Sequence, residues 1–414
     1  MRAGRLTDAL PGVARLFRIR MPLRPLSLLT ALLHAYIGLR LLPALWALSP
    51  VGAVALLLAL VVSAASIPLP FVGLGSRQRP PLHDVWRWLG LLCMGWFSSL
   101  LVLTLVRDAG LLLGWAAQGV GVLRFDGASA RRWSAAAVPL LATAVTAVGF
   151  FNARRTAPVQ RVDVPIRDLP RALVGFSIVQ LSDIHVGPTI KRGYIQRIVD
   201  AVNRLEADAI AITGDLVDGS VAELREHIAP LADLRARHGT FVVTGNHEYY
   251  AGAPAWIVEL RRLGLRVLLN EHVLLEARGA AGAQTDEESG DATLVLAGVT
   301  DFTAGHFDAT QASDPQAALA GAPASATTRV LLAHQPRSAP AAADAGFQLQ
   351  LSGHTHGGQF FPWNLFVPLQ QPFTAGLHRL RDMWVYTSRG TGYWGPPKRF
   401  GAPSEITLLR LVAA

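Results

Sequence analysis

Residues 351–359 read Leu-Ser-Gly-His-Thr-His-Gly-Gly-Gln and decide how the rest of the chain is interpreted. Two histidines stand two positions apart between glycines, directly after the alternating apolar run of residues 347–351. A strand that ends in such a turn can aim both imidazoles the same way, and glycine lets other backbone come close. A polar loop that carries two histidines by chance has the same local pattern. The interpretation therefore depends on whether similar turns occur elsewhere.

Similar turns occur four times upstream. Each follows an apolar run that we predict to be a strand: Asp183 and His185 follow residues 176–181, Asp215 follows residues 209–213, Asn246 and His247 follow residues 240–244, and His334 follows residues 329–333. With His354 and His356, these turns hold five of the twelve histidines. Because ligands of open α/β sheets bind beyond the carboxyl ends of the strands, we expect these side chains to meet.

The residue types indicate a metal site without thiolates. The only cysteine, Cys93, lies in an apolar run, which excludes an internal disulfide and a cysteine-based zinc site. The candidate ligands are Asp183, His185, Asp215, Asn246, His334, His354 and His356. Imidazole with carboxylate and amide oxygen suits Mn, Fe, Zn, Co or Ni rather than Ca. So many ligands suit two divalent ions that share a carboxylate. Such a pair can clamp a phosphoryl group and activate a hydroxide for attack.

The composition indicates a membrane protein. Of the 414 residues, 51% are hydrophobic and only 16% are charged. The apolar runs are residues 26–48, 51–74, 88–106 and 133–151, each near the roughly 20 residues that span a bilayer. We interpret residues 109–123 as the continuation of a long third helix rather than a fifth span. A basic face interleaved with aromatic residues is missing, so nucleic acid is not an expected partner.

The chain divides into a basic arm (residues 1–24), a helical transmembrane region (25–151), a polar linker (152–174) and a C-terminal α/β domain (175–414). Within the last, residues 279–291 are predicted to be an exposed hairpin loop. Arginines in the arm, in residues 75–87 and directly after Phe151 would share one side of the membrane. The positive-inside rule therefore favours a multi-pass protein of the cell (inner) membrane with a cytoplasmic C-terminal domain.

The order of the motifs resembles the calcineurin-like metallophosphoesterases, and within them the bacterial membrane-associated YkuE/YaeI-like type. The matching blocks are Asp183-Ile184-His185, residues 214–218, residues 245–248, His334 and residues 353–356. Each block alone is weakly specific, but the five together, in the family's order, are highly specific. The resemblance covers about residues 177–411. It implies a four-layer α-β-β-α sandwich and a metal-dependent phosphoric ester hydrolase with a dinuclear metal centre.

The resemblance also implies a division of roles. One ion would be held by Asp183, His185 and His356, and the other by Asn246, His334 and His354, with Asp215 bridging the two. His247 would contact the phosphate and protonate the leaving group, so His247 and Asp215 are the expected catalytic residues. Asp218 would orient His247 or a ligand, or else serve as a turn or cap residue. Arg389 would meet a substrate phosphate or form a structural ion pair.

The substrate is encoded less plainly. Residues 360–369, directly after the paired histidines, are apolar, aromatic and interrupted by proline, which suits lipid contact or docking against the transmembrane helices. With the membrane anchor, they favour a lipid-linked phosphodiester, phosphomonoester or pyrophosphate. Examples are a phospholipid or UDP-diacylglucosamine, which some similar proteins cleave. Two alternatives are a membrane sensor or scaffold with a weak metal site, and a tethered phosphatase for soluble substrates.

Overall fold

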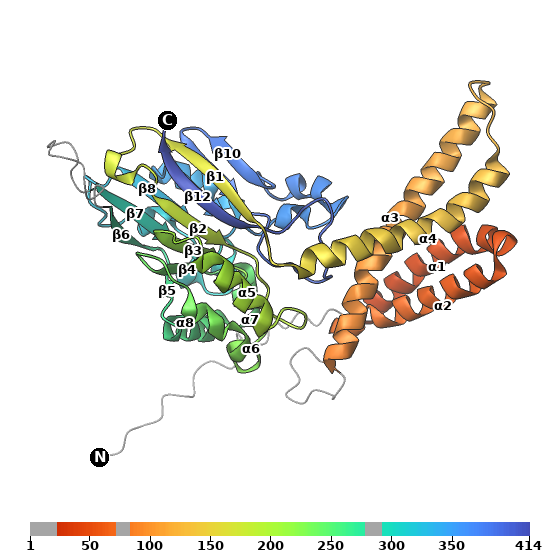
Figure 1. The fold of residues 1–414 in the computed structure, drawn as a ribbon, viewed down its shortest axis with the longest axis horizontal. Coiled ribbons are helices and arrows are strands. Elements are labelled where there is room, and N and C mark those ends of the chain that lie inside the picture. Colours follow the sequence, from red (N-terminus) through yellow and green to blue (C-terminus); the bar gives the residue numbers. More distant parts are fainter. Residues whose placement is uncertain (1–22, 72–82, 278–291) are drawn as a thin grey trace, which may run out of the picture. The chain divides into compact units, whose positions relative to one another are not determined.

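The computed structural model describes residues 23–71, 83–277 and 292–414 (Figure 1). These residues form two compact units, Met1–Thr143 and Ala144–Ala414, which are treated separately below. Almost all of the basic arm (residues 1–24), most of the loop at 75–87 and the predicted hairpin loop at 279–291 lie outside the described residues.

Helices α1 (Leu23–Leu48), α2 (Pro50–Ser66) and α3 (His83–Gly119) belong to the first unit, and α4 (Gly127–Arg154) runs from the first unit into the second. Within the described residues, four helices are long and apolar enough to cross a membrane. Helix α3 continues without a break through Arg107 and Asp108, which confirms the prediction of one long third helix. Many of its apolar side chains, including Leu112 and Leu113, are exposed, as expected of a lipid-facing helix.

Polar contacts join the first three helices within the first unit. Nε2 of His34 lies 2.9 Å from the Ser63 hydroxyl, which connects α1 to α2. Asp108 of α3 accepts hydrogen bonds from Tyr36 at 2.7 Å and from Arg40 at 2.6 Å. Because an unpaired charge is costly inside a bilayer, these pairs explain how ionisable residues are tolerated in the apolar runs.

The second unit contains two six-stranded sheets. The first has the order β1 (Val159–Ile166), β12 (Ile406–Ala413), β2 (Ser177–Leu181), β3 (Ala209–Thr213), β4 (Thr240–Val243) and β5 (Arg266–Val267). The second has the order β10 (Gly376–Leu380), β11 (Met383–Thr387), β9 (Leu349–Ser352), β8 (Thr328–Leu332), β7 (Ala292–Gly298) and β6 (Glu271–Ala277). Strands β2, β3 and β4 run parallel, as do β7, β8 and β9, so their carboxyl ends lie at the same edge of each sheet.

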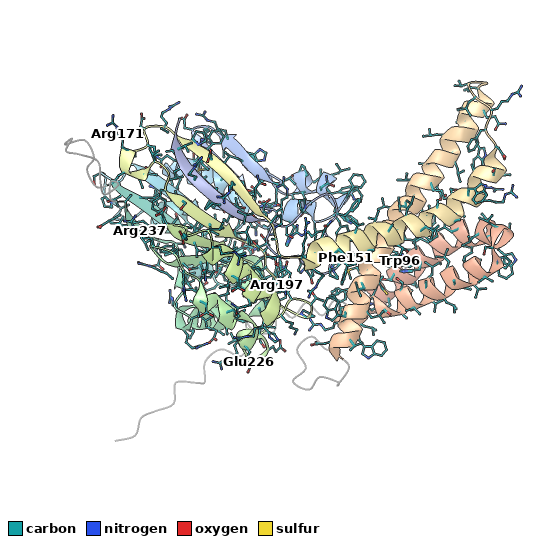
Figure 2. All side chains as sticks on the ribbon, in the orientation of Figure 1. Trp96, Phe151, Arg171, Arg197, Glu226 and Arg237 are labelled. Atoms are coloured by element: carbon teal, nitrogen blue, oxygen red, sulfur yellow. The ribbon has the colours of Figure 1, made fainter. Side chains whose placement is uncertain are left out.

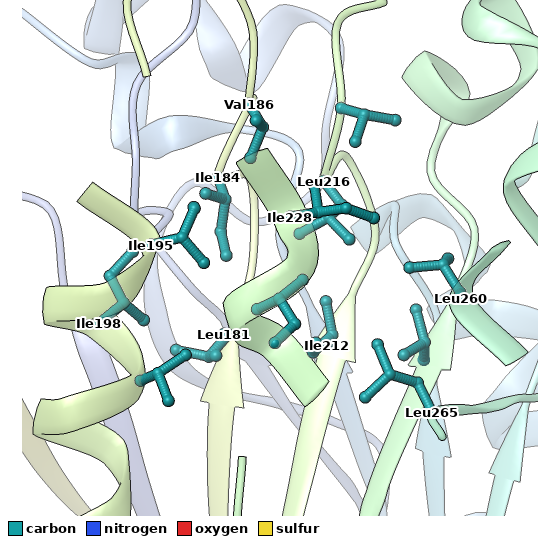
Figure 3. Close-up of a cluster of buried hydrophobic side chains, with 14 of the residues drawn as sticks. Leu181, Ile184, Val186, Ile195, Ile198, Ile212, Leu216, Ile228, Leu260 and Leu265 are labelled. Carbon is teal, nitrogen blue, oxygen red and sulfur yellow. The ribbon is translucent and has the colours of Figure 1, made fainter. Parts of the chain in front are cut away.

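Helices cover the outer face of each sheet and give the four-layer α/β architecture expected from the sequence. Helices α5 (Arg192–Asn203), α6 (Val221–Ile228), α7 (Asn246–Ala251) and α8 (Ala253–Arg262) pack on the first sheet, and α9 (Pro315–Ala318) and α10 (Ala339–Ala345) on the second. Figure 3 shows Ile195 and Ile198 of α5 beside Leu181 of β2. Each such fully buried side chain contributes roughly 1.5–3 kcal/mol. A separate apolar cluster lies between the two sheets.

The structure differs from the sequence prediction in two elements. The predicted polar linker (residues 152–174) contains β1, because its alternating residues Val162, Val164 and Ile166 turn one face inward as β1 pairs with β12. The sequence also predicts one helix over residues 221–238, but α6 ends at Ile228, and Pro230 follows in a short 3-10 turn. Proline cannot continue a helix interior because it lacks the amide hydrogen, which explains the earlier end.

Candidate metal centre

The strand ends of both sheets supply the candidate ligands. Asp183 and His185 follow β2, Asp215 follows β3, His334 follows β8, and His354 and His356 follow β9, while Asn246 and His247 begin α7 directly after β4. Side chains from these turns form three groups whose ligand atoms all lie within 4.8 Å of one another. The groups are Asp183, His185 and His356; His185, Asp215 and His247; and Asp215, His334 and His354. Asp215 belongs to two groups, and both sheets contribute to the same site.

The first group, Asp183 with His185 and His356, is fully buried. Nε2 of His185 lies 3.0 Å from Nε2 of His356, and that atom lies 3.5 Å from Oδ1 of Asp183. Nδ1 of His185 contacts the Asp218 carboxylate at 2.9 Å, which places the ring proton on Nδ1 and leaves a lone pair on Nε2. The arrangement presents two nitrogens and a carboxylate oxygen to one point.

The second group, Asp215 with His334 and His354, is held mainly by backbone. Nδ1 of His334 donates to the carbonyl oxygen of Thr213 at 2.8 Å, which leaves the lone pair on its Nε2. That Nε2 lies 3.2 Å from Oδ2 of Asp215 and 3.1 Å from Nδ1 of His354. Asn246 is also buried, and its side-chain oxygen has no hydrogen-bond partner.

These observations fit divalent ions. Buried polar atoms in native proteins almost always find partners, so the Asn246 oxygen, which has none among the described residues, fits a role as an ion ligand. Two pairs of histidine nitrogens face each other at 3.0 and 3.1 Å with carboxylates beside them. Oxygen and imidazole nitrogen are a donor set that Mn, Fe, Zn, Co and Ni accept. All seven predicted ligands stand just beyond the ends of strands, and six of them lie in the ligand groups of the described residues.

The backbone at the ligands is strained. Among the described residues, ten non-glycine residues have a positive φ. Five of them are predicted ligands: Asp183, His185, Asp215, His354 and His356, with φ between 52° and 71°. Each left-handed residue costs about 1–2 kcal/mol. Such strain persists only where the surroundings over-determine it, and it gathers at functional sites.

Two glycines allow the turns to approach one another. A Cβ at Gly353 would lie 2.2 Å from Oδ2 of Asp183, and a Cβ at Gly245 would lie 2.2 Å from Oδ1 of Asp215. Both distances are far below van der Waals contact, so any side chain would push the turns apart. The glycines before His354 and Asn246 are therefore required by the close packing of the ligand-bearing backbone.

His247 and Asp218 form a pair at the edge of the site. Nδ1 of His247 lies 2.7 Å from Oδ1 of Asp218, the same oxygen that contacts His185. The resemblance implied that Asp218 orients His247 or a ligand, or else serves as a turn or cap residue, and its carboxylate contacts both His247 and His185. Burial would lower the pKa of His247, but Asp215 and Asp218 outweigh burial and raise that pKa to about 9. Both carboxylates therefore favour the protonated form of His247, the form that can donate a proton.

Two buried residues, Glu248 and Arg399, hold the ligand turns through hydrogen bonds. The carboxylate of Glu248 accepts backbone hydrogen bonds from Asp215, Leu216, Val217 and Gly245, at 2.7–3.3 Å. Arg399 is fully buried and donates to the carbonyl oxygen of His356 at 2.8 Å, while its second terminal nitrogen lies 3.0 Å from Nδ1 of that histidine. Because guanidinium only donates, the ring nitrogen Nδ1 and the carbonyl oxygen of His356 both accept from Arg399, which fixes this turn.

Arg389 is engaged in the ion pair that the sequence left as one of two possibilities. Its guanidinium lies 2.9 Å from Oε2 of Glu405. Glu405 is buried and also accepts from the Tyr386 hydroxyl at 2.7 Å, which raises the pKa of that tyrosine further than burial alone does. The described contacts therefore assign Arg389 a structural bond.

Exposed aromatic rings surround His247. Its ring centroid lies 5.6 Å from that of Trp394 and 5.3 Å from that of Tyr250. Both aromatic side chains are more than half exposed. Gln359 fixes Trp394 by accepting from its amide and donating to its carbonyl, each at 2.8 Å. The site therefore opens beside His247 onto an apolar, aromatic rim.

Comparisons with known proteins agree with the geometry. A family model described as calcineurin-like phosphoesterase matches residues 176–358. A protein of Bos taurus described as a transmembrane protein with metallophosphoesterase domain is 40% identical over 331 residues, which cover 78% of this chain and 73% of that one. A Helicobacter pylori protein described as an uncharacterized metallophosphoesterase is 37% identical over 266 residues, covering 64% and 66%. The metallophosphoesterase YkuE of Bacillus subtilis is 28% identical over 286 residues, covering 66% and 93%.

Proposed function

The chain belongs to the calcineurin-like metallophosphoesterases, which are metal-dependent phosphoester hydrolases, and from this premise we propose that it hydrolyses a phosphoester or pyrophosphate bond of a lipid-linked substrate at a two-metal centre. The observation that carries the proposal is the convergence of ligand groups around Asp215, which belongs to two of them. A carboxylate between two groups suits two ions better than one.

We assign one ion to Asp183, His185 and His356 and the other to Asn246, His334 and His354, with Asp215 between them. When bound, two divalent ions supply Lewis acidity, neutralising phosphoryl charge and lowering the pKa of a bound water. Asp215 positions both groups, and its other oxygen accepts the amide hydrogen of His247 at 2.9 Å, which ties the acid to the same carboxylate.

His247 is the proposed general acid. Its contact with Asp218 holds the proton on Nδ1 and supports positive charge on the ring, so Nε2 is free to donate to the leaving oxygen. Nε2 lies 4.0 Å from Oδ2 of Asp215, which keeps the donating nitrogen beside the ligand groups. Without this proton, the leaving group departs as an unprotonated alkoxide or phosphate, which is the harder route when its pKa is high.

The lipid-linked substrate is supported by the anchor and the surroundings of the site. The chain is a membrane protein with four candidate spans within the described residues. Trp394 and Tyr250 give the mouth of the site an apolar wall, and residues 361–369 expose further apolar side chains. We also propose insertion in the cell (inner) membrane with the catalytic domain in the cytoplasm, because arginines flank the proposed cytoplasmic ends of the spans.

The test is hydrolysis by the purified full chain, loaded in turn with Mn, Fe, Zn, Co or Ni. Bis-p-nitrophenyl phosphate reports the chemistry, and a panel of phospholipids and nucleotide-linked lipids reports the substrate class. Preference for acylated substrates over their short-chain analogues is the expected result. Equal rates on both would favour a tethered phosphatase for soluble substrates, and no turnover with any ion would favour a sensor or scaffold.

A further inference from the structure

Outside the metal centre, residues 361–369, here called the apolar segment, expose five large hydrophobic side chains. It consists of two short 3-10 turns, Trp363–Leu365 and Val367–Leu369, and contains no charged residue. Its exposed side chains, with their exposed fractions, are Phe361 (54%), Trp363 (46%), Leu365 (61%), Phe366 (52%) and Leu369 (80%). Contiguous exposed apolar surface of this kind marks an interaction site.

The apolar segment is fixed to the metal centre at both ends. Gly358 approaches the Asn364 backbone so closely that a Cβ would lie 2.2 Å from its Cα, which holds the first turn against the residues after His356. At the other end, Gln371 donates to Gln335 at 3.3 Å, and Gln335 is the neighbour of His334. The exposed side chains are therefore held in place beside predicted ligands of both groups.

The same segment is connected to the end of a membrane helix. The amide of Phe361 donates to the carbonyl oxygen of Phe400 at 2.9 Å. The preceding residue, Arg399, donates its amide to the carbonyl oxygen of Gly149 in α4 at 2.8 Å and accepts from the Asn152 side chain at 3.3 Å. Gly149 lacks a side chain where the Lys398 stem passes, since a Cβ there would lie 2.6 Å from that stem.

Gly149 and Asn152 stand where the apolar run of α4 ends. The run of residues 133–151 contains no charged residue, and Asn152, Arg154 and Arg155 follow it. Phe151, labelled in Figure 2, is 71% exposed on the same turn. A helix with this pattern leaves the hydrocarbon at about Phe151, so the residues bound to Gly149 and Asn152 lie at the level of the lipid headgroups.

We propose that the apolar segment is a membrane-docking surface whose occupant is the bilayer in which the chain is anchored. Trp, Phe and Leu on an uncharged surface are the side chains that enter the boundary between headgroups and acyl chains. Continuity with α4 makes the bilayer the nearest apolar phase to this surface. The docked segment places the metal centre at the lipid surface, and this consequence for substrate access rests on the proposed function.

The docking is tested by probe quenching in the full chain in lipid nanodiscs. In a Cys93→Ser background, a single cysteine at Phe366→Cys or Leu369→Cys is labelled with an environment-sensitive fluorophore. Val258→Cys, an exposed apolar position on α8, is the matched control. We expect nitroxide-bearing lipids to quench the two segment probes strongly and aqueous iodide to quench them weakly, with the reverse at Val258.

Iodide quenching at Phe366 and Leu369 equal to that at Val258 would overturn the proposal. Protection from both quenchers would overturn it too, since it means that protein rather than lipid covers the segment. The measurement needs no turnover, so it stands or fails separately from the proposed hydrolysis.

A second readout tests the consequence for substrate access. The double variant Phe366→Ser with Leu369→Ser should keep its rate on bis-p-nitrophenyl phosphate while losing about tenfold or more on a vesicle-borne phosphoester. Withdrawing one buried Phe or Leu from an apolar phase weakens partitioning by roughly that factor. An equal loss on both substrates would show damage to the site instead, and no loss on either would refute the role in substrate access.

Discussion

Two of the ligand groups, the first with His185 and His356 and the second with His334 and His354, have different supports. The first group contacts charged side chains, because His185 meets Asp218 and His356 meets Arg399. The second group is supported by the backbone, because Nδ1 of His334 donates to the carbonyl oxygen of Thr213. Side-chain supports can be removed by single substitutions, whereas a strand carbonyl cannot. The first ion should therefore be separable from the second by substitutions outside the ligand set.

The largest expected effect is the loss of metal from both ligand groups at once. Asp215→Ala deletes the carboxylate common to two of the ligand groups, so both ions should be lost and activity should fall by at least about a thousandfold. Metal analysis of the purified variant measures the loss directly. Asp163→Ala, which removes an exposed partner of Arg410, is the control and should retain full metal content. Full activity in Asp215→Ala would refute a two-ion site centred on this residue.

The next effect separates chemistry from metal binding. His247→Ala should keep both ions and lose about 100- to 10,000-fold in rate on substrates with poor leaving groups, as expected when a general acid is removed. Substrates with p-nitrophenolate, which departs without a proton, should lose much less. The measurement compares the hydrolysis rates on the two substrate types at equal metal content. A similar loss on both would assign His247 to binding rather than to proton transfer.

Substitution of Arg399 sharpens the contrast between the groups. Arg399→Met removes the hydrogen bond to the carbonyl oxygen of His356, which fixes the turn that carries this ligand, while keeping much of the side-chain volume. The first proposed ion should then bind about 10- to 100-fold more weakly, as when other outer partners of ligands are removed. The second ion should be unaffected. Metal titration with an ion such as Co, whose absorption reports each site, would follow the two affinities. An equal loss of affinity for both ions would contradict the expected difference between the two ligand groups.

The smallest effect on metal binding belongs to Thr213→Val. The carbonyl oxygen that holds His334 remains, so affinity for both ions should be unchanged. The Thr213 hydroxyl accepts from Gln180 at 2.9 Å, and its loss should lower the free energy of unfolding by about 1–3 kcal/mol. Chemical denaturation and metal titration of the same sample give both values. A large loss of the second ion would mean that the side chain, not the backbone, positions His334.

The sequence was sufficient to predict the strands that belong to the repeated pattern of an apolar run followed by a candidate ligand. The alternating or continuous apolar runs before Asp183, Asp215 and His334 predicted strands, and the structure has β2, β3 and β8 there. The edge strands were harder. Strand β10 was not predicted, because its residues are all half-buried or exposed and show no clear inward face. Strand β1 was taken for linker because its polar residues Gln160, Arg161 and Asp163 hide the alternation.

The candidate ligands and Asp218 were predicted because they belong to short motifs, whereas the supporting role of Arg399 was not. Arg399 lies 43 residues from His356 along the chain, and only folding brings the two together. Glu248 lies 32 residues from Leu216 along the chain, and folding lets it accept from the amides of the turn that carries Asp215. Both residues are buried, and their hydrogen-bond partners come from distant parts of the chain that meet only in the folded protein. A local pattern contains no signal for such contacts.

Arg399 also has a consequence for how the enzyme should be prepared. Its backbone bonds to Gly149 and Asn152 at the end of α4, while its side chain holds His356. A truncated fragment that starts at β1 would keep every predicted ligand but lose the hydrogen bonds between Arg399 and the end of α4. We expect such a fragment to be purified with less than its full complement of metal. Adding back residues 144–158, rather than more metal, should restore it.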